Sequence, residues 1–213
     1  MSGTEQQEPS PEEVLAAVTH QVEQDRGRAA SDPKARPELA ASLNALATML
    51  NAVGQVNEAV KPAEEAVELR RALAGEAPDT TPDLALALNT LATMLGAAER
   101  FDEALMAAQE GTIVYRGLAR ATPEQYIPDL ALSLGAEGRL LAGAQRMRDA
   151  CTAAQEGVSK LKPFFEHAPE PFAPLMRMLC ADYVRYAQGS RQQPDAALLD
   201  PIVEVFKKLP PAQ

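Results

Sequence analysis

The sequence predicts an all-α protein built from stacked helix hairpins, and three observations support this prediction. The fourteen residues from Pro37 share ten identities with the fourteen from Pro82, and the pattern returns in weaker form from Pro128. These three prolines lie 45 and 46 positions apart, and a fixed period of this length is typical of a repeat array. Aromatic residues make up only 4% of the 213 residues and tryptophan is absent, whereas β-sheets favour aromatic and β-branched residues.

Composition narrows the functional classes. The formal net charge of −10 disfavours a nucleic-acid-binding protein, which usually carries a basic surface. The polar N-terminus lacks the pattern of a secretory signal, and no apolar run is long enough to span a membrane, so we predict a cytoplasmic protein that does not bind membranes. The two cysteines, Cys151 and Cys180, lie among apolar helical positions and are interpreted as reduced core thiols rather than a disulfide.

The N-terminal segment divides into a tail and a helix. Residues 1–9 are polar and are predicted to be disordered. Ser10 is a suitable N-cap, Pro11 fits the first helical position, and Glu13 completes a capping box. We therefore expect an N-terminal capping helix over residues 10–30.

Three repeats are predicted next, over residues 37–74, 82–119 and 128–161. Each consists of two helices, and those of the third are expected over 128–142 and 147–161. In the first helix of the first repeat, leucines spaced four, three and four residues apart form one apolar stripe: Leu39, Leu43, Leu46 and Leu50. Pro62 lies inside the second helix of that repeat and is expected to kink it or weaken one turn.

After Pro163 the repeat register is expected to be lost. Residues 165–209 are interpreted as a divergent C-terminal unit that caps the array, because an exposed end would leave an apolar face in water. We expect one helix over 171–188 and then, from Asp195 to Leu209, a last helix or a broken pair of helices, because Pro201 interrupts this stretch. Residues 210–213 form a tail, and residues 10–209 are predicted to be a single domain.

The repeated residues resemble the tetratricopeptide repeat. That family has a large residue, a leucine three positions later, then a small residue and another large one, as do two sets here: Leu43, Leu46, Ala47 and Leu50, and Leu88, Leu91, Ala92 and Leu95. Second helices of the family carry a large residue followed by small ones, as at Phe101, Ala104 and Gly111. The repeat length and the stretch 81–92 are similar to the longer repeats of kinesin light chains. The resemblance implies a right-handed α-solenoid of antiparallel hairpins.

The third repeat departs from this family pattern. Glu137 occupies a position where leucine is expected, and Gly135 and Gly138 flank it. The first helix of this repeat is therefore expected to pack less well than its counterparts.

The resemblance also implies a concave groove, lined by the first helices, that receives a peptide or a partner segment. Carried over by position, the groove residues are Asn44, Thr48, Asn51, Leu86, Asn89, Thr93, Leu132 and Arg139. Asn44 and Asn89 match the asparagine that hydrogen-bonds the bound peptide backbone in kinesin-light-chain-like repeats; alternatively, both tie down a neighbouring helix. Arg139 is the only cation among the groove positions, so the carboxylate-binding activity of another branch of the family is not predicted.

We therefore predict a non-enzymatic protein-interaction module with a protein or peptide partner, monomeric or weakly homo-oligomeric. The alternative is a structural or self-associating subunit of a larger complex, and the mass in solution would distinguish the two. No cofactor or metal is expected, because no metal-ligand spacing or glycine-rich phosphate loop is present. No catalytic residue is expected either: His20 and His167 are far apart in the sequence, and Cys151 has no evident base.

Overall fold

A computed structural model of the chain describes residues 10–77, 79 and 81–210, and all regular structure within them is helical. Within each of two compact units, successive helices pack against each other, which confirms the predicted all-α helical-repeat solenoid. Two compact units make up the chain, the first ending at Arg100 and the second beginning at Phe101. The predicted disordered segment 1–9 and residues 211–213 of the predicted tail lie outside the described residues. The single domain over 10–209 stays a prediction.

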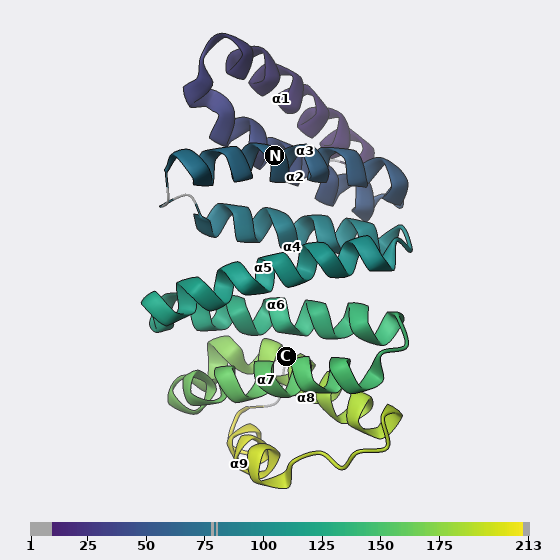
Figure 1. Cartoon of the computed structure of the whole chain (residues 1–213), viewed down its shortest axis with the longest axis vertical. Helices are drawn as coiled ribbons and strands as arrows, with labels where there is room; N and C mark the ends of the chain where they lie inside the picture. The colour runs from purple at the N-terminus through teal and green to yellow at the C-terminus, as the bar shows by residue number, and fades with distance from the viewer. Residues whose placement is uncertain (1–9, 78, 80, 211–213) are drawn as a thin grey trace, which may run out of the picture. The chain divides into compact units, whose positions relative to one another are not determined.

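The described residues of the first unit include four α-helices and, before the second of them, a short 3-10 helix. Their bounds are α1, Pro11–Ser31; η1, Pro33–Ala35; α2, Arg36–Ala52; α3, Val56–Glu76; and α4, Thr81–Ala97. Each α-helix packs against the next, and α2 also contacts α4 (Figure 1). The predicted capping box begins α1: the Ser10 hydroxyl accepts a hydrogen bond from the Glu13 backbone N–H at 3.2 Å, and the Glu13 carboxylate accepts one from the Ser10 N–H at 2.8 Å.

The core of the first unit contains leucines of the repeated pattern. Leu39 and Leu43 are buried in a cluster with Val22 of α1 and Ala66 of α3. The second helix, α3, continues through Pro62. Near its end, the buried Arg70 guanidinium donates a hydrogen bond of 2.9 Å to the Asp83 carboxylate, which joins α3 to α4.

One buried carboxylate lies on the face of α1 that packs against α2. Burial of Asp25 raises the pKa of its carboxyl group, but hydrogen bonds from Ser42, Arg28 and Gln21 outweigh that effect and hold the pKa below its ordinary value. Asp25 therefore stays ionised at neutral pH, where Gln21 donates a hydrogen bond to its Oδ1 at 2.9 Å and Arg28 pairs with it.

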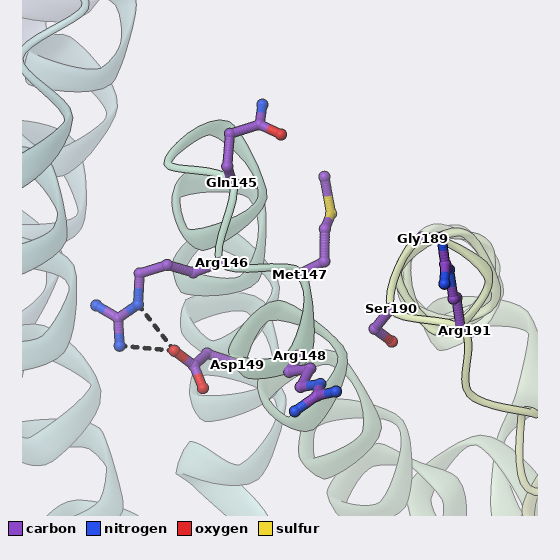
Figure 2. A pocket seen from close by; sticks show the side chains of 8 residues that line it. All are labelled: Gln145, Arg146, Met147, Arg148, Asp149, Gly189, Ser190 and Arg191. Atoms are coloured by element: carbon purple, nitrogen blue, oxygen red, sulfur yellow. Dashed lines mark hydrogen bonds and ion pairs between the residues drawn. The ribbon is translucent and has the colours of Figure 1, made fainter.

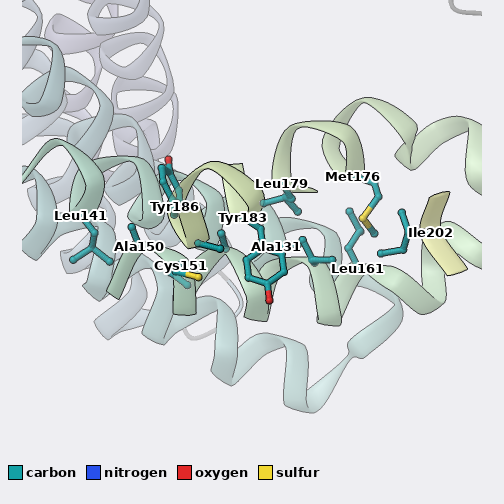
Figure 3. Close-up of a cluster of buried hydrophobic side chains, with 14 of the residues drawn as sticks. Ala131, Leu141, Ala150, Cys151, Leu161, Met176, Leu179, Tyr183, Tyr186 and Ile202 are labelled. Carbon is teal, nitrogen blue, oxygen red and sulfur yellow. The ribbon is translucent and has the colours of Figure 1, made fainter. Parts of the chain in front are cut away.

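The described residues of the second unit form five helices: α5, Phe101–Ala121; α6, Pro123–Gly143; α7, Met147–His167; α8, Pro169–Gly189; and α9, Ala196–Phe206. Helices α5 to α8 pack in succession, α6 also contacts α8, and α9 packs against α7 and α8. Their shared core includes Leu161 of α7, Leu179 of α8 and Ile202 of α9 (Figure 3). Pro201, which was expected to interrupt the last helix, lies inside α9.

The repeat register continues to the end of α8, so the prediction that it is lost after Pro163 is wrong. Helices α6 and α8 are both 21 residues long and begin 46 positions apart, at Pro123 and Pro169. The turns that follow them place Gln145 and Arg191, also 46 positions apart, at φ values of 61° and 58°. Two local signals therefore preserve the period: proline at the first helical position and a left-handed residue after the helix. The helix starts and the turns keep the repeat period, whereas the side chains of the leucine and asparagine pattern diverge.

The structure corrects two of the predicted helix boundaries. Helix α6 begins at Pro123 rather than at the expected Pro128, which lies inside it. Pro123 takes the first helical position, where the missing backbone N–H of proline costs nothing. Helix α7 continues through Pro163 to His167, beyond the expected end at residue 161.

Gly135 improves the packing of α6, which contradicts the expectation of a poorly packed helix. A Cβ atom on Gly135 would lie 2.8 Å from Leu179 Cδ2 of α8, and one on Gly138 would lie 3.4 Å from the backbone oxygen of Ala150 in α7. Both glycines are buried. The missing side chain of Gly135 allows α8 to approach α6 closely, which offsets the low helix propensity of glycine.

Two glycine substitutions are expected to have opposite effects on stability. Gly117→Ala in α5 should raise the free energy of unfolding by about 0.5–1 kcal/mol, because no atom lies within 4 Å of the added Cβ. Gly135→Ala should lower it by about 1 kcal/mol or more, because the added Cβ overlaps the fully buried Leu179. Urea denaturation of the two variants and the wild type measures both changes. Equal stabilisation by the two substitutions would contradict the close approach at Gly135.

Candidate functional site

Six of the eight predicted groove residues lie on two neighbouring helices of the first unit. Helix α2 carries Asn44, Thr48 and Asn51, and α4 carries the equivalent Asn89 and Thr93. The remaining one, Leu86 of α4, is 56% exposed. Because α2 contacts α4, the structure brings the two sets of residues onto adjacent helices. We call these six residues the first-helix face.

The two threonines have the same local geometry. Thr48 Oγ1 donates a hydrogen bond to the Asn44 carbonyl oxygen at 2.9 Å, and Thr93 Oγ1 donates one to the Asn89 carbonyl oxygen at 2.9 Å. Both threonines are exposed. Each hydroxyl proton is therefore used within its own helix, which leaves the hydroxyl oxygen lone pairs available as acceptors.

Asn44 has unused hydrogen-bonding capacity. Asn44 as a whole is half-buried, and its Oδ1 atom is buried without a hydrogen-bond partner among the described residues. Buried polar atoms are usually paired, and an unpaired one costs about 1–3 kcal/mol. The alternative interpretation, that Asn44 ties down a neighbouring helix through this oxygen, receives no support from the described residues. Asn89 is also half-buried.

The two predicted residues of the second unit lie on α6. Leu132 is 46% exposed. Arg139 extends towards α8, where its guanidinium lies 3.6 Å from Asp182 Oδ2 and donates a hydrogen bond of 3.4 Å to the sulfur of Met178. Arg139 is therefore partly neutralised within the unit.

Asp182 and Arg185 of α8 accompany Arg139, and the sequence prediction missed both. Asp182 is only 7% exposed, and Arg185 donates hydrogen bonds to its Oδ1 at 2.5 Å and to the Tyr186 hydroxyl at 3.0 Å. Burial raises the pKa of Tyr186 and keeps this hydroxyl protonated. Arg185 lies 46 positions after Arg139, so extending the period past Pro163 would have identified it.

A cavity of about 470 Å³ lies beside these side chains, with Arg139, Arg185, Tyr186 and Met147 among its lining residues. A larger cavity of about 690 Å³ involves the α6–α7 turn, the start of α7 and the end of α8 (Figure 2). Its lining residues are Gln145, Arg146, Met147, Arg148, Asp149, Gly189, Ser190 and Arg191. Nothing in the sequence prediction pointed to this second cavity.

The described residues offer little for catalysis. His20 shares a hydrogen bond of 2.8 Å with Gln24 on the exposed side of α1, and His167 is exposed at the end of α7. Both cysteines are free thiols. Burial raises the pKa of the Cys151 thiol and raises that of Cys180 to about 11, which disfavours the reactive thiolate.

The described part of the chain has neither a metal-binding cluster nor a membrane-spanning helix. No cluster of three or more histidine, cysteine, aspartate or glutamate side chains there has a geometry that could hold a metal ion. No helix in that part combines the length and apolar character needed to cross a bilayer.

Comparison with known proteins identifies the repeat. A family model described as tetratricopeptide repeat matches residues 39–83, which cover α2 from Leu39, α3 and the start of α4. No curated protein matches the sequence.

Solved structures extend the similarity in fold over nearly the whole chain. A protein of kinesin light chain type with nearly identical TPR-like repeats from Podosopora anserina aligns with a TM-score of 0.62 and 20% identity over 92% of this chain and 90% of its own. A single-residue variant of it aligns with a TM-score of 0.68 and 19% identity over 93% and 87%. BtubC (BKLC) from P. vanneervenii aligns with a TM-score of 0.56 and 14% identity over 97% and 96%. The chain therefore carries a tetratricopeptide repeat, and its helices have the fold of the kinesin-light-chain-like class of these repeats.

Proposed function

We propose that the protein is an interaction module that binds an extended peptide segment of a partner protein along the first-helix face of the first unit. The tetratricopeptide-repeat fold is a general protein-interaction scaffold and is typically non-enzymatic. The proposal is more specific, because it assigns the binding to the face that carries Asn44 and Asn89. The protein would act as a cytoplasmic monomer or weak homo-oligomer.

The unpaired amide of Asn44 is the observation that supports this proposal most directly. An asparagine side chain offers two N–H donors and a carbonyl acceptor, so it pairs with the backbone of an extended peptide regardless of sequence. The Asn44 side chain makes no hydrogen bond with the described residues. A bound peptide would supply the missing partner, with the amide reorienting to expose its oxygen where needed.

The surroundings of Asn44 favour an extended chain over a bulky ligand. The other exposed positions of α2 on the same stripe carry small side chains: Ala41, Ala45, Thr48 and Ala52. Such a surface lets a peptide backbone approach the helix closely. On α4, the exposed Leu86 adds an apolar contact for a peptide side chain.

The test is selection of peptides from a random library against the full chain, followed by affinity measurements on three variants. Asn44→Ala and Asn89→Ala should each weaken binding of the selected peptides about fivefold to tenfold, the loss of one hydrogen bond of about 1 kcal/mol. Neither should lower the melting temperature by more than about 3 °C.

The matched control is Asn57→Ala, which removes an exposed asparagine from the first turn of α3. This variant should bind the selected peptides as the wild type does. Peptides that bind all three variants with wild-type affinity would refute the assignment of binding to the first-helix face.

A further inference from the structure

The larger cavity of the second unit concentrates positive charge in an acidic protein. Three of its lining residues are arginines, Arg146, Arg148 and Arg191, against the single carboxylate of Asp149. The whole chain has a net charge of −10, so this local excess is opposite in sign to the rest of the molecule.

All three arginines are exposed, and the guanidinium groups of two of them have no partner among the described residues. Arg146 is neutralised by Asp149, which accepts hydrogen bonds from its Nε at 2.8 Å and its terminal nitrogen at 2.7 Å (Figure 2). Arg148 and Arg191 make no side-chain hydrogen bond or ion pair with any described residue. They belong to different elements, the start of α7 and the turn after α8, and both line the cavity.

The fold does not require arginine at either position. Arg148 is the second residue of α7, and the second residues of α3 and α5 are Asn57 and Asp102. A cation in the first turn of a helix is electrostatically unfavourable, whereas an aspartate there is favourable. Arg191 occupies a left-handed turn position that is Gln145 one repeat earlier. Local structure therefore explains neither arginine.

Among the described residues, Met147 is the one large apolar side chain that lines the cavity. Met147 lies across the end of α8, where a Cβ atom on Gly189 would lie 3.5 Å from its sulfur. This contact joins the start of α7 to the end of α8, so the segments that carry Arg148 and Arg191 are held at either side of the cavity. Met147 adds an apolar side chain to a lining that also carries the two arginines.

We propose that this cavity binds an acidic peptide segment of a partner protein, with Arg148 and Arg191 pairing with its carboxylates. Guanidinium groups form short, charge-assisted hydrogen bonds with carboxylates. The volume of about 690 Å³ suits a few side chains rather than a long polymer. A long nucleic acid is disfavoured, because most of its phosphates would extend beyond the cavity over the acidic remainder of the chain, whereas a short acidic segment can place its carboxylates beside the arginines. This site lies on the second unit and is independent of the first-helix face of the first.

The experiment measures binding of acetylated hexaglutamate to the full chain by calorimetry, with hexaglutamine as the uncharged probe. The test variant is Arg148→Asn with Arg191→Gln, which installs the residues that the fold already uses at Asn57 and Gln145. The control variant is Arg120→Asn with Lys208→Gln, which removes two exposed charges of the same unit outside the cavity. Both double variants change the net charge equally.

Hexaglutamate should bind the wild type and the control variant equally well, and the test variant about tenfold or more weakly. Its affinity should fall between about 20 mM and about 200 mM salt, because the ion pairs are screened. Asn44→Ala should leave this affinity unchanged, which separates a failure of this proposal from a failure of the first-helix face.

Three outcomes would overturn the proposal. The first is hexaglutamate binding that is the same for test and control variants. The second is hexaglutamine binding as tightly as hexaglutamate. The third is self-association of the wild type that the test variant abolishes, which would assign the cavity to the acidic surface of a second copy: residues 1–100 hold 16 acidic and 8 basic residues, and residues 101–213 hold 14 and 12.

Discussion

Phe165→Ala is expected to lower the free energy of unfolding by about 3–5 kcal/mol. Phe165 of α7 is completely buried, and its ring centroid lies 4.7 Å from that of Phe206 in α9. Removing the ring would leave a cavity that close-packed neighbours cannot fill. The aromatic contact with Phe206 would be lost in addition to the buried apolar area.

Two measurements check this prediction. Urea denaturation gives the change in stability, and hydrogen exchange reports where the structure opens. Because α9 contacts only α7 and α8 among the described helices, its amides should lose protection more than those of α6. Phe172→Ala, at a half-buried phenylalanine of α8, is the matched control and should cost less than half as much. Similar losses for the two variants would contradict the prediction.

Leu88→Ala should have the second-largest effect, a loss of about 2–5 kcal/mol in the free energy of unfolding. Leu88 lies in the middle of α4 and is 1% exposed. Its removal takes away apolar contacts on the buried face of α4, which packs against α2 and α3. The loss combines the transfer free energy of the leucine side chain with the cost of the cavity.

Leu86 provides the control for this prediction within the same repeated stretch. It lies two residues earlier in α4 but is 56% exposed, so Leu86→Ala should change stability by no more than about 0.5 kcal/mol. Thermal or urea denaturation of both variants measures the difference. Equal destabilisation would mean that the two leucines have similar surroundings, contrary to the structure.

The sequence predicted the regular elements well, because the signals that define them are local. The capping box at Ser10 and the leucine spacing around Leu43 each act within one or two helical turns. The boundary errors at Pro123 and His167 also have a local cause: Pro128 and Pro163 were interpreted as helix limits, whereas helices in this protein continue through proline. Pro169 and Arg191 lie 46 positions after Pro123 and Gln145, so the sequence keeps its period there, but the prediction ended that period at Pro163.

The candidate sites were predicted less completely. The groove was inferred by positional analogy, and six of its eight predicted residues lie on the neighbouring helices α2 and α4. The unpaired amide of Asn44 was not visible in the sequence, because burial of one oxygen atom depends on neighbouring helices. The surroundings of Arg139 were also missed, since its partner Asp182 lies one repeat away on a different helix.

The sequence by itself determined that this protein is an all-helical repeat array with a period of 45 to 46 residues, because helix starts, helix ends and apolar stripes are set by residues close together in the chain. Only the tertiary structure decided which side chains meet across helices. Arg148 and Arg191 lie 43 positions apart in the sequence and line one cavity because α7 and α8 pack against each other. Packing also decided that glycine is favourable at position 135 of α6, because an added Cβ there would lie 2.8 Å from the buried Leu179 side chain.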